Sequence, residues 1–247
     1  TIPSTTGCDS NPWRETSSMV VSRGWIAAVQ TDRYVYALGG NDRQGNYINS
    51  IEKIVLNPDG SLGTWELLAT PVLSPRMNFA AVASGNFIYV LGGYSGSTYL
   101  SSVERAEIKA DGTLGAWQVM TSMTTERHQV AAVAINGYLY ALGGVNKNND
   151  ALSSVERAAI NADGTLGAWQ LMNTEMTVGH SGDAAVAANN YIYMLGRYTT
   201  EYTTINPDGS LEPWQTTASL SVPRDYLAAA AANGHLYAIG GSAIGPI

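Results

Sequence analysis

The chain has 247 residues, of which 45% are hydrophobic and only 13% are charged, and its formal net charge is −7. That length allows a large core in one domain or two, and the negative charge makes nucleic acid and anionic lipid poor partners. A single cysteine excludes an internal disulfide framework and a paired-cysteine metal site, and no apolar run approaches the roughly 20 residues of a membrane helix.

Two patterns recur along the chain about every 50 residues. The first is an apolar, tyrosine-containing segment that ends in glycine, with the first glycines at Gly39, Gly92, Gly143, Gly196 and Gly240. The second is a tryptophan, at Trp13, Trp65, Trp117, Trp169 and Trp214. A period of this length is typical of propellers, in which one small sheet repeats around an axis.

Each repeat predicts four strands, which we name A to D in chain order. Strand A is an alanine-rich run, at 26–29, 79–83, 130–134, 183–187 and 227–231. Alanine favours helix, but runs this short and bounded by turns are too short for stable helices. Only small side chains fit where several blades converge on one axis, so we expect strand A to be innermost.

Strand B is the segment that ends at the recurring glycine, and its apolar character on both faces indicates burial between neighbouring blades. Strand C is predicted at 51–56, 103–108, 155–160 and 201–205, and an Asp-Gly turn follows it. Strand D is predicted to begin at the tryptophan, whose ring is expected to cover the outer edge of the blade.

The glycine pair, the tyrosine three residues before it, the tryptophan about 25 residues after it and an arginine 16 residues before it resemble the Kelch family. The arginines are Arg23, Arg76, Arg127 and Arg224, with His180 at the corresponding position of the fourth repeat. The resemblance covers essentially the whole chain. It implies an all-β propeller of four-stranded antiparallel blades that binds partners without catalysis or a cofactor.

The form of the turn before strand D, as in 111–117, is similar to that of extracellular bacterial members of the family. The chain begins at Thr1 without a methionine or a signal peptide, and we expect a processed, secreted protein. Cys8 is predicted to be a free thiol in a turn, or else to form an intermolecular bond.

Five A–B units and five tryptophans predict a five-bladed propeller in a single domain, residues 1–247. Residues 1–6 and a strand from Trp13 would supply strands C and D of the last blade, and residues 225–241 would supply strands A and B. Pairing of the two termini would then close the ring and remove its open sheet edges.

The resemblance implies a partner-binding face built from the D–A and B–C loops. The candidate residues on this face are Trp25, Asn78, His128, Gln129, His180, Asp183, Arg197, Asp225 and Tyr226. Aromatic area surrounded by polar groups suits a peptide loop or a sugar. We expect a non-catalytic module that binds a protein partner in an extracellular assembly, and carbohydrate binding through Trp25 and Tyr226 is the alternative.

The fourth repeat departs from the others, with His180 for arginine, Asp183 for an apolar residue and Arg197 for the second glycine. An ion pair between Asp183 and Arg197 is expected, either beside a binding notch or as compensation for drift of the repeat. Sialic-acid mutarotases share the fold, so an epimerase that uses His180 with Glu126 or Asp183 is a further alternative. The chain is nevertheless predicted not to be an enzyme and to hold no metal.

The glutamates of strand C recur in step with the arginines that precede strand A. They are Glu52, Glu104, Glu156 and Glu201. One arginine–glutamate ion pair per repeat, with a structural role, is therefore predicted.

Overall fold

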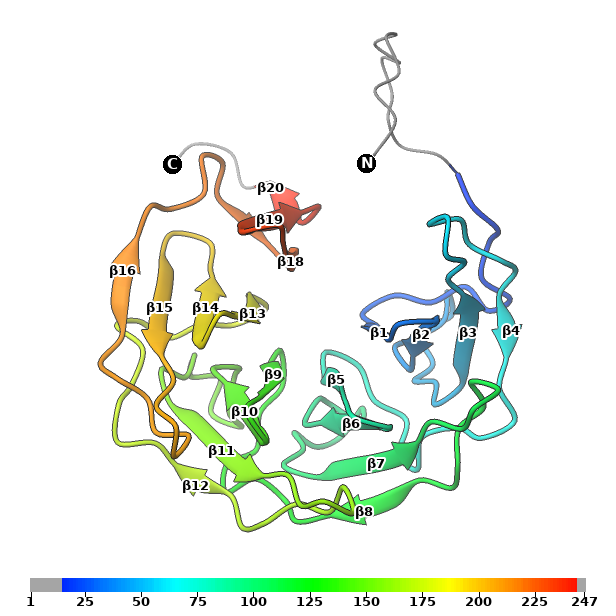
Figure 1. Ribbon diagram of the computed structural model, residues 1–247, viewed down its shortest axis with the longest axis horizontal. Coiled ribbons are helices and arrows are strands. Elements are labelled where there is room, and N and C mark those ends of the chain that lie inside the picture. The colour runs from blue at the N-terminus through cyan, green and yellow to red at the C-terminus, as the bar shows by residue number, and fades with distance from the viewer. Residues whose placement is uncertain (1–14, 244–247) are drawn as a thin grey trace, which may run out of the picture.

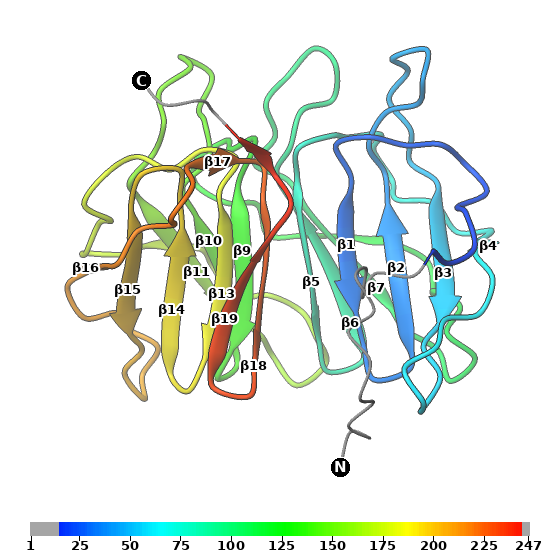
Figure 2. The ribbon, with the colours of Figure 1, turned by 90° about the horizontal axis from the view of Figure 1, so that it is seen from above.

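The computed structural model describes residues 15–243, and every regular element in it is a β-strand. Four-stranded antiparallel sheets are arranged as blades around a central axis, so the molecule is an all-β propeller (Figure 1). Seen from the side, the strands run along the axis and the loops gather at its two ends (Figure 2). The described part of the chain has no helix long and apolar enough to cross a membrane.

Four blades are complete, and the strands of each follow the chain from the axis outward. The first contains β1 (Ala27–Gln30), β2 (Tyr34–Leu38), β3 (Ile51–Val55) and β4 (Glu66–Leu67). The second contains β5 (Ala80–Ser84), β6 (Phe87–Leu91), β7 (Val103–Glu107) and β8 (Gln118–Met120). The third contains β9 (Ala131–Ile135), β10 (Tyr138–Leu142), β11 (Val155–Ala159) and β12 (Gln170–Leu171). The fourth contains β13 (Ala184–Ala188), β14 (Tyr191–Leu195), β15 (Thr200–Thr204) and β16 (Gln215–Thr217).

The last unit is a two-stranded sheet of β18 (Ala228–Ala232) and β19 (His235–Ile239), next to the short pair β17 (Arg224–Asp225) and β20 (Ser242–Ala243). The described residues therefore form four complete blades, and the predicted count of five is not confirmed. The strands expected at residues 1–6 and from Trp13 lie outside the described residues, as does Cys8.

The alanine-rich runs are the innermost strands, as predicted, although each begins one residue later than expected. In Figure 1, β1, β5, β9, β13 and β18 lie closest to the axis. Strands B and C also occur within about one residue of their predicted bounds. The steric demand for small side chains at the axis overrides the helix propensity of alanine.

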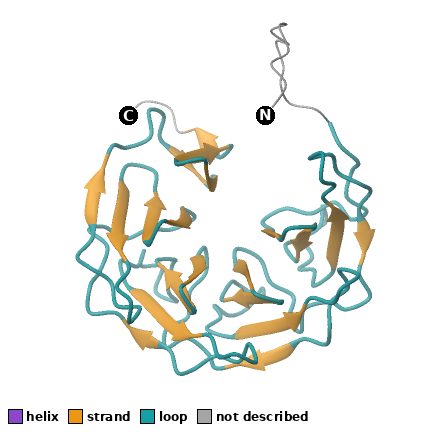
Figure 3. Cartoon of the chain, viewed as in Figure 1, coloured by secondary structure: helices purple, strands orange, loops and turns teal. Residues whose placement is uncertain are grey.

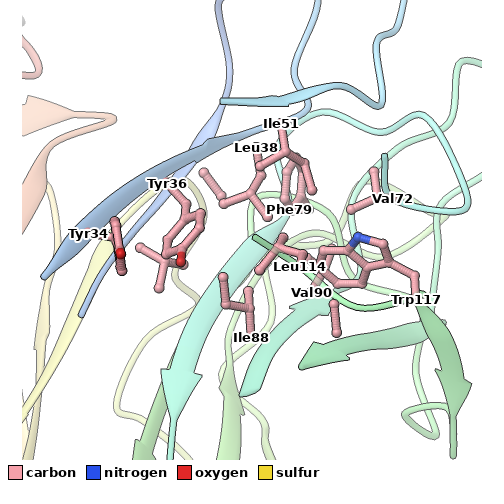
Figure 4. Packing of buried hydrophobic residues seen from close by; sticks show 13 residues of the cluster. Tyr34, Tyr36, Leu38, Ile51, Val72, Phe79, Ile88, Val90, Leu114 and Trp117 are labelled. Atoms are coloured by element: carbon pink, nitrogen blue, oxygen red, sulfur yellow. The ribbon is translucent and has the colours of Figure 1, made fainter. Parts of the chain in front are cut away.

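The hydrophobic core lies between neighbouring blades. Between the first and second blades, Tyr36, Leu38, Ile88 and Trp117 are buried in one cluster (Figure 4). Fully burying one large apolar side chain contributes about 1.5–3 kcal/mol. Trp117 is 6% exposed and belongs to this cluster, and Trp169 and Trp214 belong to the corresponding clusters of the next two interfaces. For these three tryptophans, the prediction that the ring covers the outer edge is wrong. Strand D begins one residue after the tryptophan because that residue packs inward, against the preceding blade.

Each of the first three blades also forms hydrogen bonds with the Asp-Gly turn of the blade that follows it. The hydroxyl of Tyr36 donates to the carbonyl of Gly112 at 3.0 Å, and Lys53 Nζ donates to the neighbouring Asp111 carbonyl at 2.8 Å. Gly112 has a φ of +76°, and a Cβ there would lie 2.6 Å from the ring of Tyr34. Glycine is therefore required at this turn both by its backbone conformation and by its contact with the neighbouring blade.

The predicted arginine–glutamate pairs are present in the first three blades, and their side chains are almost completely buried. In the third blade, Arg127 Nη2 lies 3.0 Å from Glu156 Oε1, and Arg127 Nη1 donates to the Gly143 carbonyl at 2.8 Å. Glu156 in turn accepts the backbone N–H groups of Thr124 and Thr125 at 2.6 and 3.1 Å. The pair therefore fixes the D–A loop to strands B and C of the same blade. The other pairs are Arg23–Glu52 and Arg76–Glu104.

We expect Arg127→Ala to lower the free energy of unfolding by about 3–5 kcal/mol, because it leaves the Glu156 carboxylate buried without its counter-ion. Urea denaturation monitored by tryptophan fluorescence measures this loss. Lys147→Ala is the control, since Lys147 is 74% exposed and lies 3.6 Å from Glu126 in a surface pair. Equal stability of the two variants would contradict a structural role for the buried pair.

Candidate functional site

One end of the propeller axis is surrounded by five equivalent loop positions, one from each blade or unit. Four of them are non-glycine residues with left-handed backbone: Trp25, Asn78, Gln129 and Tyr226 have φ values of 54°, 53°, 54° and 55°. The fifth is Gly182, with a φ of 69°. Positive φ is uncommon for residues other than glycine, so its recurrence here indicates a shared structural demand.

That demand is a chain of backbone hydrogen bonds from one blade to the next. The N–H of Asn78 donates to the Trp25 carbonyl at 3.3 Å, and the N–H of Gln129 donates to the Asn78 carbonyl at 2.7 Å. The N–H of Gly182 donates to the Gln129 carbonyl at 3.1 Å, and the N–H of Tyr226 donates to the Gly182 carbonyl at 3.0 Å. We call these five residues the collar. Their hydrogen bonds compensate for the cost of the left-handed backbone.

The two ends of the collar meet through side chains. The rings of Trp25 and Tyr226 lie edge to face with centroids 4.8 Å apart, and Gln129 Nε2 donates to the Tyr226 hydroxyl at 3.1 Å. Trp25 is 47% exposed and Tyr226 is 45% exposed. They border a cavity of about 370 Å³, lined by the collar and by the residue after each collar position. An aromatic pair thus stands half-exposed at the mouth of the axial channel.

The B–C loops rise above the same face on the first three blades (Figure 2). They carry an aromatic cluster that sequence analysis did not identify. Tyr99 stacks on His128 with centroids 4.7 Å apart, Tyr94 lies 5.3 Å from Tyr99, and Tyr47 lies 5.9 Å from Tyr94. The available signal was tyrosine at equivalent positions of the first two B–C loops, Tyr47 and Tyr99, but the third loop contains no tyrosine.

The fourth blade has no such raised loop on this face, because its B–C connection is short. That connection has four residues (196–199), whereas the B–C loop of the first blade has twelve (39–50). Arg197 in this short connection forms a bidentate ion pair with Asp225 of β17, with Nε 2.5 Å from Oδ1. The expected ion pair between Asp183 and Arg197 is therefore wrong. Asp183 Oδ2 instead lies 2.8 Å from His180 Nδ1, which leaves Arg197 to the carboxylate of the neighbouring unit.

His180 takes the place of the buried arginine of the other blades. It is 1% exposed, and its Nε2 lies 3.0 Å from Glu201 Oε1. Burial opposes a charge on the imidazole, but the hydrogen bonds and charges of Asp183 and Glu201 outweigh it, so the pKa of His180 is raised above 6.5. Burial has the opposite result at His128, where no carboxylate pairs with the ring and the pKa is lowered.

A second cavity, of about 260 Å³, lies beside the fourth blade. It is lined by Gly179, Ser181, Asp183, Arg197, Tyr198, Asp225 and Tyr226. Asp183 and Tyr226 line both cavities, so the two adjoin. Among residues 15–243, no three His, Cys, Asp or Glu side chains are grouped as metal ligands.

The structure thus brings most of the predicted site residues together. Trp25, Asn78, Gln129, Asp183 and Tyr226 line the first cavity, and Asp183, Arg197, Asp225 and Tyr226 line the second. His180 lies buried behind Asp183. His128 lies apart from both cavities, within the tyrosine cluster of the B–C loops.

The two histidines are expected to titrate on opposite sides of pH 6.5. His180 stabilises the fold fully below about pH 6.5, and this contribution is lost as the pH rises through its raised pKa. His128 favours the neutral ring, so its contribution is lost as the pH falls. NMR titration of the imidazole Cε1 protons measures both values, with His180→Arg and His128→Gln used to assign the signals. A titration of His180 below that of His128 would contradict the ion-pair geometry.

Two segments of the chain, residues 75–105 and 126–157, match the family model for the Kelch motif. A Kelch repeat and BTB domain-containing protein of cowpox virus is 26% identical over 243 residues, which cover 94% of this chain and 40% of the viral protein. An F-box/kelch-repeat protein of Arabidopsis thaliana is 33% identical over 153 residues, which cover 60% of this chain and 35% of the plant protein.

The chain therefore spans about 40% or less of the length of these relatives. They are viral and plant proteins, so they give no support to the expected bacterial extracellular type. The repeating motif, the four-stranded blades and the two matched segments are thus features in which the chain is similar to Kelch-repeat proteins.

Proposed function

We propose that the protein is a non-catalytic interaction module that binds a protein partner through the collar face. Kelch-repeat proteins are generally protein-interaction scaffolds, and that general role is what the comparisons support. The observation that carries the choice of surface is the half-exposed pair Trp25 and Tyr226 at the mouth of the channel. Tryptophan and tyrosine are the residues most enriched among interface hot spots.

The shape of the face supports the same choice. The B–C loops of three blades form a raised wall, whereas the fourth blade is low and adjoins the smaller cavity (Figure 2). A partner segment that crosses the low blade would meet the aromatic pair at the centre and polar side chains around it. A central aromatic anchor with a polar rim is the usual composition of a protein interface.

Trp25→Ala is expected to weaken partner binding at least tenfold, because it removes the largest exposed aromatic surface of the collar. The measurement is affinity capture from the native source, followed by titration of the captured protein against wild type and variant. Val119→Ala is the matched control, since Val119 is 66% exposed but lies on β8, at the outer edge of the second blade. Equal loss in both variants, or in neither, would remove the collar face from the proposal.

Carbohydrate binding remains the alternative prediction, because Trp25 and Tyr226 also suit stacking against a sugar ring. A glycan array separates the two, since sugar binding that disappears in Trp25→Ala would favour the lectin. The epimerase alternative is weakened by His180, which is 1% exposed and has both ring nitrogens engaged. An extracellular setting remains a proposal based on the sequence.

We also propose that the ring has five blades, with residues 1–14 contributing to the last one. The support comes from contacts that the first three blades form and the last unit does not. Tyr237 is 45% exposed, whereas its equivalent Tyr89 is fully buried. The Asp-Gly turn of the first blade also lacks a contact that the second blade has. A Cβ at Gly60 would meet nothing within 4 Å, whereas a Cβ at the equivalent Gly112 would meet the ring of Tyr34.

Trp13→Ala is therefore expected to lower the free energy of unfolding by about 3 kcal/mol, as for a buried aromatic residue. Chemical denaturation of the full chain is the measurement. Trp25→Ala serves as the comparison, because its ring is 47% exposed and its loss should cost much less. If Trp13→Ala is the milder of the two substitutions, closure through the N-terminal residues is wrong.

A further inference from the structure

The fourth blade places a carboxylate where the other blades carry apolar side chains. The equivalent residues around the channel mouth are Ile26, Phe79, Val130 and Leu227, and all of them line the larger cavity together with Asp183. The Asp183 side chain is only 7% exposed. A carboxylate buried to this degree needs partners for both oxygens, because an unsatisfied polar group in the interior is costly.

Only one of the two oxygens of Asp183 has such a partner among the described residues. Oδ2 is 2.8 Å from His180 Nδ1, whereas Oδ1 is buried and accepts no hydrogen bond. The backbone of Gly196 packs closely against the Asp183 carboxylate and the His180 ring. A Cβ at Gly196 would lie 2.9 Å from Asp183 Oδ2 and 2.7 Å from the His180 ring. Asp183 is thus held in place with one acceptor unused.

The charges around the smaller cavity favour a cation. Below the raised pKa of His180, two groups are positive, His180 and Arg197, and three are negative, namely Asp183, Glu201 and Asp225. The sum is −1. The positive charge of Arg197 is already taken by Asp225, and that of His180 is shared between Asp183 and Glu201. A donor with a positive charge would complete both the hydrogen bonding and the charge balance.

Exposed aromatic side chains form the rim of this cavity. Tyr198 is 51% exposed and Tyr226 is 45% exposed. The guanidinium carbon of Arg197 already lies 5.4 Å from the centre of the Tyr198 ring, which is the range of a cation–π contact. A cation that enters the cavity can therefore contact the aromatic rim beside Asp183. Because Oδ1 is itself buried, a donor reaches it only when a neighbouring side chain moves.

We propose that this cavity receives one arginine or lysine side chain of the protein partner, with Asp183 Oδ1 as the hydrogen-bond acceptor. The source of that side chain rests on the function proposed above, whereas the chemistry of the cavity does not. The collar aromatics would then contact the apolar part of the partner, and Asp183 would select a basic residue next to it.

The test uses the ¹⁵N-labelled full chain and two small probes, N-acetyl-arginine amide and the neutral, similarly shaped N-acetyl-citrulline amide. In NMR titrations at pH 6, we expect the arginine probe to shift the amides of Asp183, Arg197 and Asp225, and the citrulline probe to bind more weakly. Asp183→Asn should weaken arginine binding about tenfold, as expected for a hydrogen bond to a charged group. Asp150→Asn is the control, because Asp150 is an exposed carboxylate on the loop after the third strand B.

If Asp183→Asn does not fold, His180→Arg combined with Asp183→Val reproduces the pair that the third blade carries at Arg127 and Val130 and should also abolish binding of the arginine probe. Equal binding of both probes, unchanged binding in both Asp183 variants, or shifts centred elsewhere would overturn the proposal. Failure of the function proposed above has a different result. The arginine probe would still bind at Asp183, but partner capture would be unchanged in the Trp25→Ala variant.

Discussion

The fold depends on contacts between consecutive blades, because no single four-stranded sheet can bury both of its faces alone. The tyrosine of strand B provides the most regular of these contacts. Tyr89 donates to the Gly164 carbonyl at 2.7 Å and Tyr140 donates to the Gly209 carbonyl at 2.9 Å, each on the blade that follows. The buried tryptophans fill the same interfaces from the following blade, and the core clusters lie there too. The stability of each blade is therefore tied to its neighbours.

Within a blade, the buried ion pair transmits this rigidity to the loops of the collar face. Arg127 joins strands B and C, and Glu156 accepts two backbone N–H groups of the D–A loop. The fourth blade keeps the glutamate but replaces the arginine with His180, a smaller group that reaches a second carboxylate. One substitution in the repeating ion pair thus creates a local difference in charge. The four complete blades otherwise repeat the same order of four strands (Figure 3).

The repeats made much of this arrangement predictable from the sequence. Strand order, the inner position of the alanine-rich runs and the arginine–glutamate pairs follow from features that recur five or four times. The positions of Trp117, Trp169 and Trp214 were predicted incorrectly, because periodicity does not say which side of a strand faces a neighbouring blade. Asp183 and Arg197 were also paired incorrectly. Both occur once in the chain, and their partners His180 and Asp225 were determined by the packing of the short B–C connection rather than by a pattern.

The tyrosine cluster around His128 illustrates the same limit. Tyr47 and Tyr99 occupy equivalent positions, 52 residues apart, but His128, on which Tyr99 stacks, has no histidine counterpart in the other repeats. Which aromatic side chains of neighbouring loops come into contact depends on the length and conformation of each loop. The three-dimensional arrangement of the loops, and not their sequence, brings these rings together.

The hydrogen bonds that link each collar position to the next join main-chain atoms. The five positions carry Trp, Asn, Gln, Gly and Tyr, and the backbone geometry is almost the same at each. The backbone conformation of the collar therefore depends little on which side chain occupies each position. Such a surface can change its specificity by point substitution during evolution, or in the laboratory, while the architecture beneath it is preserved.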